Sequence, residues 1–224
     1  MKYEIRYKPA FACIFVTINP GESITAEAGA MTSMDAALSM KTEFSGGLFS
    51  ALLKKFLGGE SLFVNTFTNN TQKPLQLVLT QSTIGDIASI NLSNGQEICF
   101  QPGAYIAHTP GVKMGVEWAG ISSLIAGEGL FKLKLSGHGE CRVFFGAYGG
   151  LTKKSVSGEF VVDTGHLVAY QPGLKMKIGL AGGLLGSVTS GEGLINRISG
   201  QGDIYLQSRS IDGLVGYLRP KVRF

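Results

Sequence analysis

Hydrophobic and polar residues alternate along much of the chain, which is the period of a β-strand with one buried face. The alternation is clear at Phe63–Thr68, Leu75–Leu79 and Leu130–Leu135, and Met1–Tyr7 has the same period. Phe11–Ile18 is apolar nearly throughout and predicts a strongly apolar strand. Short strands separated by Asn, Pro and Gly indicate an all-β sandwich or barrel. The turn sequences are Asn19–Gly21, Asn69–Thr71, Asn94–Gly95, Gln101–Gly103, Thr109–Gly111 and Gln171–Gly173.

One segment has helical spacing instead. Its apolar residues recur every three or four positions, while Lys54 and Lys55 fall on the opposite side, so an amphipathic helix of about three turns is predicted. Glycine pairs at Gly46–Gly47 and Gly58–Gly59 bracket the segment. A helix this short is stable only when its apolar face packs on something. The apolar residues are Leu48, Phe49, Leu52, Leu53, Phe56 and Leu57.

The chain also repeats itself. Gly103–Met114 and Gly165–Met176 share Gly, Ala, Pro-Gly and Lys-Met at the same positions, and residues of the first third join the series in the same order. This predicts three copies of one β unit in a single compact body, residues 1–80, 81–148 and 149–224. Each unit alone would bury too little surface to be stable. Each has a turn with Gly and Glu, formed by Gly59 and Glu60, by Gly127, Glu128 and Gly129, and by Gly191, Glu192 and Gly193.

The glutamates of these turns allow two interpretations. Glu60, Glu128 and Glu192 would bind a cation if they met around a pseudo-threefold axis. Alternatively, each carboxylate accepts backbone hydrogen bonds at a Gly-rich turn that opens a strand. Because function must be argued from a site and not from a fold, we interpret the turns as structural.

Composition adds an expectation of association. Charged residues are 16% of the chain, against about a quarter in typical domains, and 44% of residues are hydrophobic. This predicts buried surface between units or between chains. The net charge of +4 does not argue strongly for nucleic acid or membrane. The one local basic feature is the tail, where Arg219, Lys221 and Arg223 are expected on one face of a strand.

No motif predicts an enzyme or a cofactor. The chain lacks a Gly-x-Ser-x-Gly nucleophile turn, a phosphate-binding loop and a dinucleotide-binding fingerprint. The three histidines are too far apart for a metal site, and His138 is expected at a solvent-facing turn. The three cysteines are expected as reduced thiols, mostly buried, in a cytoplasmic protein without a signal peptide. These residues are His108, His138 and His166, and Cys13, Cys99 and Cys141.

The triplicated unit, the Gly-Glu-Gly-Leu repeat and the Ala-Glu-Ala-Gly-Ala-Met segment at Ala26–Met31 carry a resemblance. Together they resemble a widespread bacterial family of unknown function whose eukaryotic relatives are called altered inheritance of mitochondria proteins. The resemblance covers essentially the whole chain. It implies a fold like that of the tryptophan RNA-binding attenuation protein, with three short double-stranded β-helix (β-sandwich) repeats in pseudo-threefold symmetry. It also implies a homotrimer, a ring of nine units, and a role close to a membrane.

RNA binding by such a ring requires stacking aromatics beside basic residues. Trp118 stands alone and is expected in the core. Lys132 and Lys134 are expected on one polar face of a strand, but the third unit has Asn196 and Ile198 at the equivalent positions. We therefore expect no RNA track.

The sequence thus predicts a non-enzymatic scaffold or binding protein that forms a homotrimer. The segment Leu48–Leu57 is its candidate contact, either with a membrane surface or with a protein partner. The alternative for this segment is a helix that seals a barrel end or a subunit interface. The alternative function is a β-helix protein that binds a small ligand or a carbohydrate.

Overall fold

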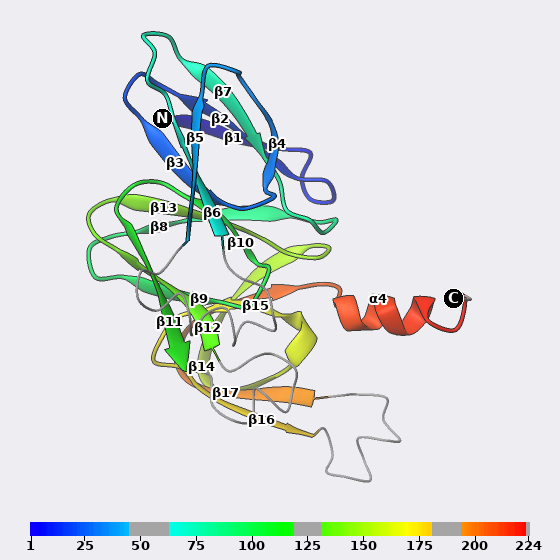
Figure 1. Ribbon diagram of the computed structural model, residues 1–224. Coiled ribbons are helices and arrows are strands. Elements are labelled where there is room, and N and C mark those ends of the chain that lie inside the picture. The colour runs from blue at the N-terminus through cyan, green and yellow to red at the C-terminus, as the bar shows by residue number, and fades with distance from the viewer. Residues whose placement is uncertain (45–62, 119–130, 181–193, 223–224) are drawn as a thin grey trace.

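The computed structural model describes residues 1–44, 63–118, 131–180 and 194–222. In these residues β-strands dominate and one short α-helix occurs, so the predicted all-β class is confirmed (Figure 1). The elements are β1 (Lys2–Arg6), β2 (Cys13–Ile18), β3 (Ser23–Glu27), β4 (Met31–Met34), β5 (Ser39–Phe44), β6 (Phe63–Thr68), β7 (Leu75–Leu79), β8 (Ile87–Leu92), β9 (Glu97–Phe100), β10 (Tyr105–His108), β11 (Val112–Trp118), β12 (Phe131–Gly137), β13 (Cys141–Gly146), β14 (Leu151–Asp163), the 3-10 turn η2 (Thr164–His166), β15 (Leu167–Tyr170), β16 (Lys175–Leu180), β17 (Leu194–Gln207) and α4 (Ile211–Leu218).

The described strands form three antiparallel sheets. The first has the order β1-β2-β7-β4 and the second the order β5-β6-β3-β10-β13-β8. The third has the order β11-β12-β9-β15-β17-β14, and β16 also pairs with β17. Figure 1 shows the first sheet at one end of the molecule, the second in the middle and the third at the other end.

Consecutive thirds of the chain share sheets. In the second sheet β3 pairs with β10, with Ala26 opposite Ala107. In the third sheet β9 pairs with β15, with Phe100 opposite Ala169. Backbone hydrogen bonds therefore join the first third to the second and the second to the third.

The hydrophobic core also spans these joints, the places where strands of consecutive thirds of the chain pair. Phe100 of β9, Phe145 of β13 and Tyr205 of β17 lie ring against ring, with centroids 5.3 Å apart for Phe100 and Phe145 and 5.0 Å apart for Phe145 and Tyr205. All three are buried, and Phe145 has no exposed surface. Because β13 belongs to the second sheet while β9 and β17 belong to the third, these rings pack the two sheets together.

The strands predicted at Phe63–Thr68 and Leu75–Leu79 are confirmed as β6 and β7. The prediction that a strand begins at Phe11 is wrong, because β2 begins at Cys13 and Phe11 is 68% exposed. The backbone N–H of Phe11 donates to the Tyr7 carbonyl at 3.1 Å and closes a turn. Apolar character alone does not separate such a turn residue from the strand that follows it.

The long pair of strands β14 and β17 contains two facing glycines, Gly158 and Gly200. Gly158 lies inside β14, within a ladder that is continuous from Leu151 to Asp163. Both glycines have positive φ, 97° and 125°, which other residues rarely adopt. The ladder therefore passes through this unusual backbone conformation without ending.

The expectation that Lys132 and Lys134 share a solvent-facing side of their strand is wrong for Lys132. Only 1% of Lys132 is exposed, and its Nζ donates to the Gln101 side chain. The neighbouring Leu133 is also buried, so β12 is covered on both faces at this point. Lys134 is half-buried and forms an ion pair with Glu97 at 3.1 Å. The prediction from the alternating pattern fails here because it assumes that one face of the strand is exposed to solvent.

The tail is not a strand. Residues Ile211–Leu218 form α4, and the Ser210 side chain caps it by accepting a hydrogen bond from the Gly213 N–H at 3.1 Å. Arg219 and Lys221 follow the helix, and Arg223 lies outside the described residues. The alternation of the basic residues concealed the helical spacing of the apolar residues before them.

Replacing Phe145 by Ala is expected to lower the free energy of unfolding by about 3–5 kcal/mol, because it removes the ring that joins two sheets and leaves a cavity. Urea unfolding at one protein concentration measures the change. Phe11→Ala is the matched control and should change stability by less than about 0.5 kcal/mol, because Phe11 is exposed. Equal losses from the two variants would contradict this account of the core.

Candidate functional site

The residues that the sequence nominated lie outside the described residues. The segment Leu48–Leu57 falls within 45–62, and the turns at Glu60, Glu128 and Glu192 fall within 45–62, 119–130 and 181–193. The side chain of Trp118, at the end of β11, is not described either. These predictions stay predictions, and the described residues offer other candidate features.

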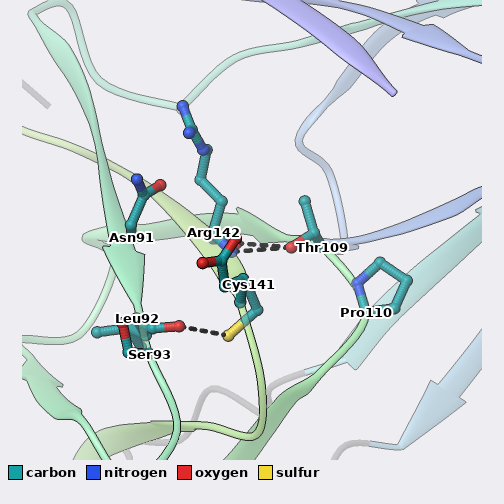
Figure 2. A pocket seen from close by; sticks show the side chains of 8 residues that line it. Asn91, Leu92, Ser93, Thr109, Pro110, Cys141 and Arg142 are labelled. Carbon is teal, nitrogen blue, oxygen red and sulfur yellow. Dashed lines mark hydrogen bonds between the residues drawn. The ribbon is translucent and has the colours of Figure 1, made fainter.

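A pocket of about 430 Å³ lies beside the edge strand β8 (Figure 2). Two hydrogen bonds lie within its lining: the backbone N–H of Arg142 donates to Thr109 Oγ1 at 2.8 Å, and the Cys141 thiol donates to the Leu92 carbonyl at 3.3 Å. Figure 2 shows the Arg142 side chain extending away from these hydrogen bonds. Its guanidinium lies over the Tyr3 ring, 4.5 Å from the centroid. The cation of this pocket is therefore held by the protein itself.

A second pocket of about 380 Å³ shares residues Asn91 and Leu92 of β8 with the first and extends to β14 and β17. Lys153 and Asp203 form an ion pair at 2.7 Å across it. Hydrogen bonds from Lys153 and then Ser155 hold the pKa of Asp203 below its ordinary value. Asp203 is therefore a structural carboxylate rather than a base. Among the described residues no aromatic side chain lines either pocket, so these linings offer no stacking surface for a sugar or a base.

The buried polar pair Tyr105 and His108 lies where the first and second thirds of the chain meet. The Tyr105 hydroxyl is 2.7 Å from His108 Nδ1 and 3.3 Å from the Thr25 carbonyl of β3. Both hydrogen bonds form together when His108 Nδ1–H donates to the Tyr105 hydroxyl and this hydroxyl donates to the Thr25 carbonyl. Burial lowers the pKa of His108 to about 4 and raises that of Tyr105 well above its ordinary value. Both groups are therefore neutral at physiological pH and stabilise the joint between β3 and β10.

Within the described ranges no three His, Cys, Asp or Glu side chains lie close enough together to hold a metal ion. His138 lies at an exposed turn, as predicted. None of the three cysteines is in a disulfide, and Cys99 and Cys141 are buried while Cys13 is partly buried. Burial raises the pKa of the Cys141 thiol and outweighs a backbone hydrogen bond that lowers it. The Cys141 thiol is therefore a poor nucleophile.

Each described sheet ends in open edge strands, and the sequence did not point to two of them, β4 and β14. Among the strands that the structure describes, β4 pairs only with β7, and β14 pairs only with β17. Met31 of β4 is 38% exposed and Val161 of β14 is 46% exposed. An open edge presents unpaired backbone groups to which another strand can add.

The helix α4 is the second feature that the sequence reasoning missed. It lies at the surface with none of its residues buried, although most of them are apolar. The signal that would have found it is the apolar spacing of three and four residues after Ser210. In the described part of the chain, no helix combines the length and the apolar content that crossing a membrane requires.

Acid is expected to destabilise the fold through His108. The unfolded chain binds a proton near pH 6.5 but the folded chain only near pH 4. The stability contributed by neutral His108 is therefore complete above about pH 6.5 and is lost as the pH falls to 4, by up to roughly 3 kcal/mol. Urea unfolding between pH 7 and pH 4 measures the loss.

The matched control is His108→Gln, which keeps a hydrogen-bonding side chain beside Tyr105 but does not titrate. Carboxylates contribute equally to both proteins, so they cancel in the difference between the two curves. If the variant loses stability over this pH range as steeply as the wild type, the assignment to His108 is wrong.

Comparison with known proteins agrees with this fold. A protein of Streptococcus pyogenes serotype M6, named only as uncharacterised, is 25% identical over 228 residues, which cover 98% of this chain and 90% of that protein. A crystal structure of a Streptococcus pyogenes protein has the same fold, with a TM-score of 0.78, 24% identity and 99% of both chains covered. Residues 3–209 match the family described as Mitochondrial biogenesis AIM24. The chain therefore belongs to the AIM24 family, in agreement with the resemblance seen in its sequence.

Proposed function

We propose that the protein is a non-enzymatic scaffold that assembles into a homotrimer by strand addition between copies. In this assembly β4 of one copy pairs with the second half of β14, Glu159–Asp163, of the next. The observation that carries the proposal is that these are the two open edges that a repeat of the chain's own joints would bring together.

The strand pairings support a chain of three like units. β5 pairs with β6, β11 with β12, and β16 with the first half of β17. In each of these ladders the methionine of the first strand faces a large apolar residue of the second. The pairs are Met40 with Phe67, Met114 with Leu135, and Met176 with Ile198.

The irregularities of the sheets fall at matching positions too. β4, β10 and β15 each shift register by one residue where they pair with β7, β13 and the second half of β17. The shifts lie between Met31 and Ser33, between Tyr105 and Ala107, and between Leu167 and Ala169. Three bulges at one place in three similar hairpins favour a common unit.

Two of the three joints that such a repeat predicts lie within the chain. β3 of the first unit pairs with β10 of the second, and β9 of the second pairs with β15 of the third. The third joint would pair the second half of β14 with β4. If it follows the register of the other two, Ser33 lies opposite Val162, and Met34 lies opposite Val161.

Pairing between copies is favoured over pairing within one chain. Figure 1 shows β4 and β14 in the sheets at opposite ends of the molecule. A head-to-tail contact of this kind closes into a ring when the rotation between copies fits. We take three copies, giving nine units, because that is the number that the family resemblance implies. The low content of charged residues agrees with surface buried between copies.

The absence of an enzymatic role is part of the proposal. In the described residues the cation of each pocket is already held by another protein group, Arg142 by the Tyr3 ring and Lys153 by Asp203. A carbohydrate-binding role has less support because neither pocket has an aromatic wall. An RNA-binding ring has less support because Lys132 is buried. We place the scaffold in the cytoplasm, in contact with a membrane surface.

A cysteine pair across the proposed joint tests both the assembly and its register. In a Cys13→Ser background, Ser33→Cys with Val162→Cys should form a disulfide between copies on mild oxidation, because facing residues in a ladder lie about 4.5–5.5 Å apart. A non-reducing gel should then show covalent dimers and trimers. Light scattering of the unmodified protein should give the mass of three chains.

The matched control is Ser33→Cys with Val161→Cys, which moves one thiol to the opposite face of the strand. It should link far less. Linkage that stays within single chains, equal linkage in both pairs, or a monomer mass in light scattering would each contradict the proposed joint.

A further inference from the structure

The helix α4 projects from the end of β17, away from the sheets (Figure 1). Every residue from 211 to 222 is exposed. The Ser210 side chain caps the helix by accepting a hydrogen bond from the Gly213 N–H, and this bond does not connect the helix to the sheets. A helix of eight residues has marginal stability in water. A surface that covers its apolar side would stabilise it.

That apolar side is a continuous stripe. Ile211, Leu214, Val215 and Leu218 recur at the spacing that places them on one face of a helix, with exposed fractions between 37% and 54%. The opposite side has two glycines, Gly213 and Gly216. The stripe is therefore presented to the surroundings and not to the protein's own core.

The charges around the stripe indicate what covers it. Arg209 precedes the helix and Arg219 and Lys221 follow it, while Asp212 is the one acidic residue from 208 to 222. The chain as a whole carries a net charge of +4, so a second copy does not offer the net negative charge that these three cations favour. A membrane with anionic lipids offers both an apolar layer for the stripe and negative charge for the three cations.

We propose that α4 binds an anionic lipid surface by burying Ile211, Leu214, Val215 and Leu218 among the acyl chains while Arg209, Arg219 and Lys221 contact lipid phosphates. At about 12 Å the helix is too short to span a bilayer and lies in its interface. This names the membrane-contacting element of the scaffold proposed above, but it does not require the trimer. Assembly would strengthen the binding because three helices act together.

Co-sedimentation with phosphatidylcholine vesicles, with and without phosphatidylglycerol, tests the proposal. The wild-type protein should sediment with the anionic vesicles and not with the neutral ones, and added salt should release it. The test variant is Leu218→Asp and its matched control is Gly216→Asp. Both add one negative charge to the same exposed helix, and a side chain at Gly216 meets no atom within 4 Å.

Because only Leu218→Asp also removes apolar surface from the stripe, it should bind at least about tenfold more weakly than Gly216→Asp. A wild-type protein that stays in the supernatant, or two variants that bind equally, would overturn the proposal. Light scattering of the same samples separates it from the assembly. If Leu218→Asp alone loses the trimer mass, α4 is a subunit contact and the lipid proposal is wrong. If the wild type is a monomer that still binds through Leu218, the trimer is wrong and the lipid proposal stands.

Discussion

Backbone pairing between consecutive thirds of the chain is the constraint on which the rest of the structure depends. β3 with β10 and β9 with β15 are short ladders, yet they decide which strands share a sheet. Once they form, Phe145 is brought against Phe100 and Tyr205, and the neutral pair Tyr105 and His108 is enclosed. Buried backbone groups need partners, so neither ladder can open without exposing the core beside it.

The same pairing leaves an unpaired strand edge in the first third of the chain and another in the last third. A sheet that grows by adding strands always has a last strand, and monomeric proteins usually protect it with charge, proline or a covering segment. β1 gives such cover to β2. The outer edge of β4 has no comparable cover among the described strands, and Val161 exposes an apolar side chain on β14. This exposed apolar surface at a sheet edge is what the proposed assembly would cover.

The sequence predicted most of what local physics controls. Period-two patterning located β6 and β7, and the turn sequences separated the strands correctly in most of the first two thirds. It failed where the environment differs from the assumed one. Lys132 is buried because both faces of β12 are covered, which no local pattern reveals. α4 was missed because its basic residues also fit a strand period. The open edges are invisible in sequence because an edge is defined by which strands are absent beside it.

The distance along the chain between paired strands also bears on how the protein is made. Thr25 of β3 pairs with His108 of β10, which is synthesised 83 residues later. At about 5–20 residues per second this is an interval of roughly 4–17 seconds. During it the nascent first third exposes an apolar strand edge on the ribosome. The cell must keep that edge from pairing with neighbouring nascent chains, so the rate of synthesis and the supply of chaperones bear directly on how much of this protein reaches its native state.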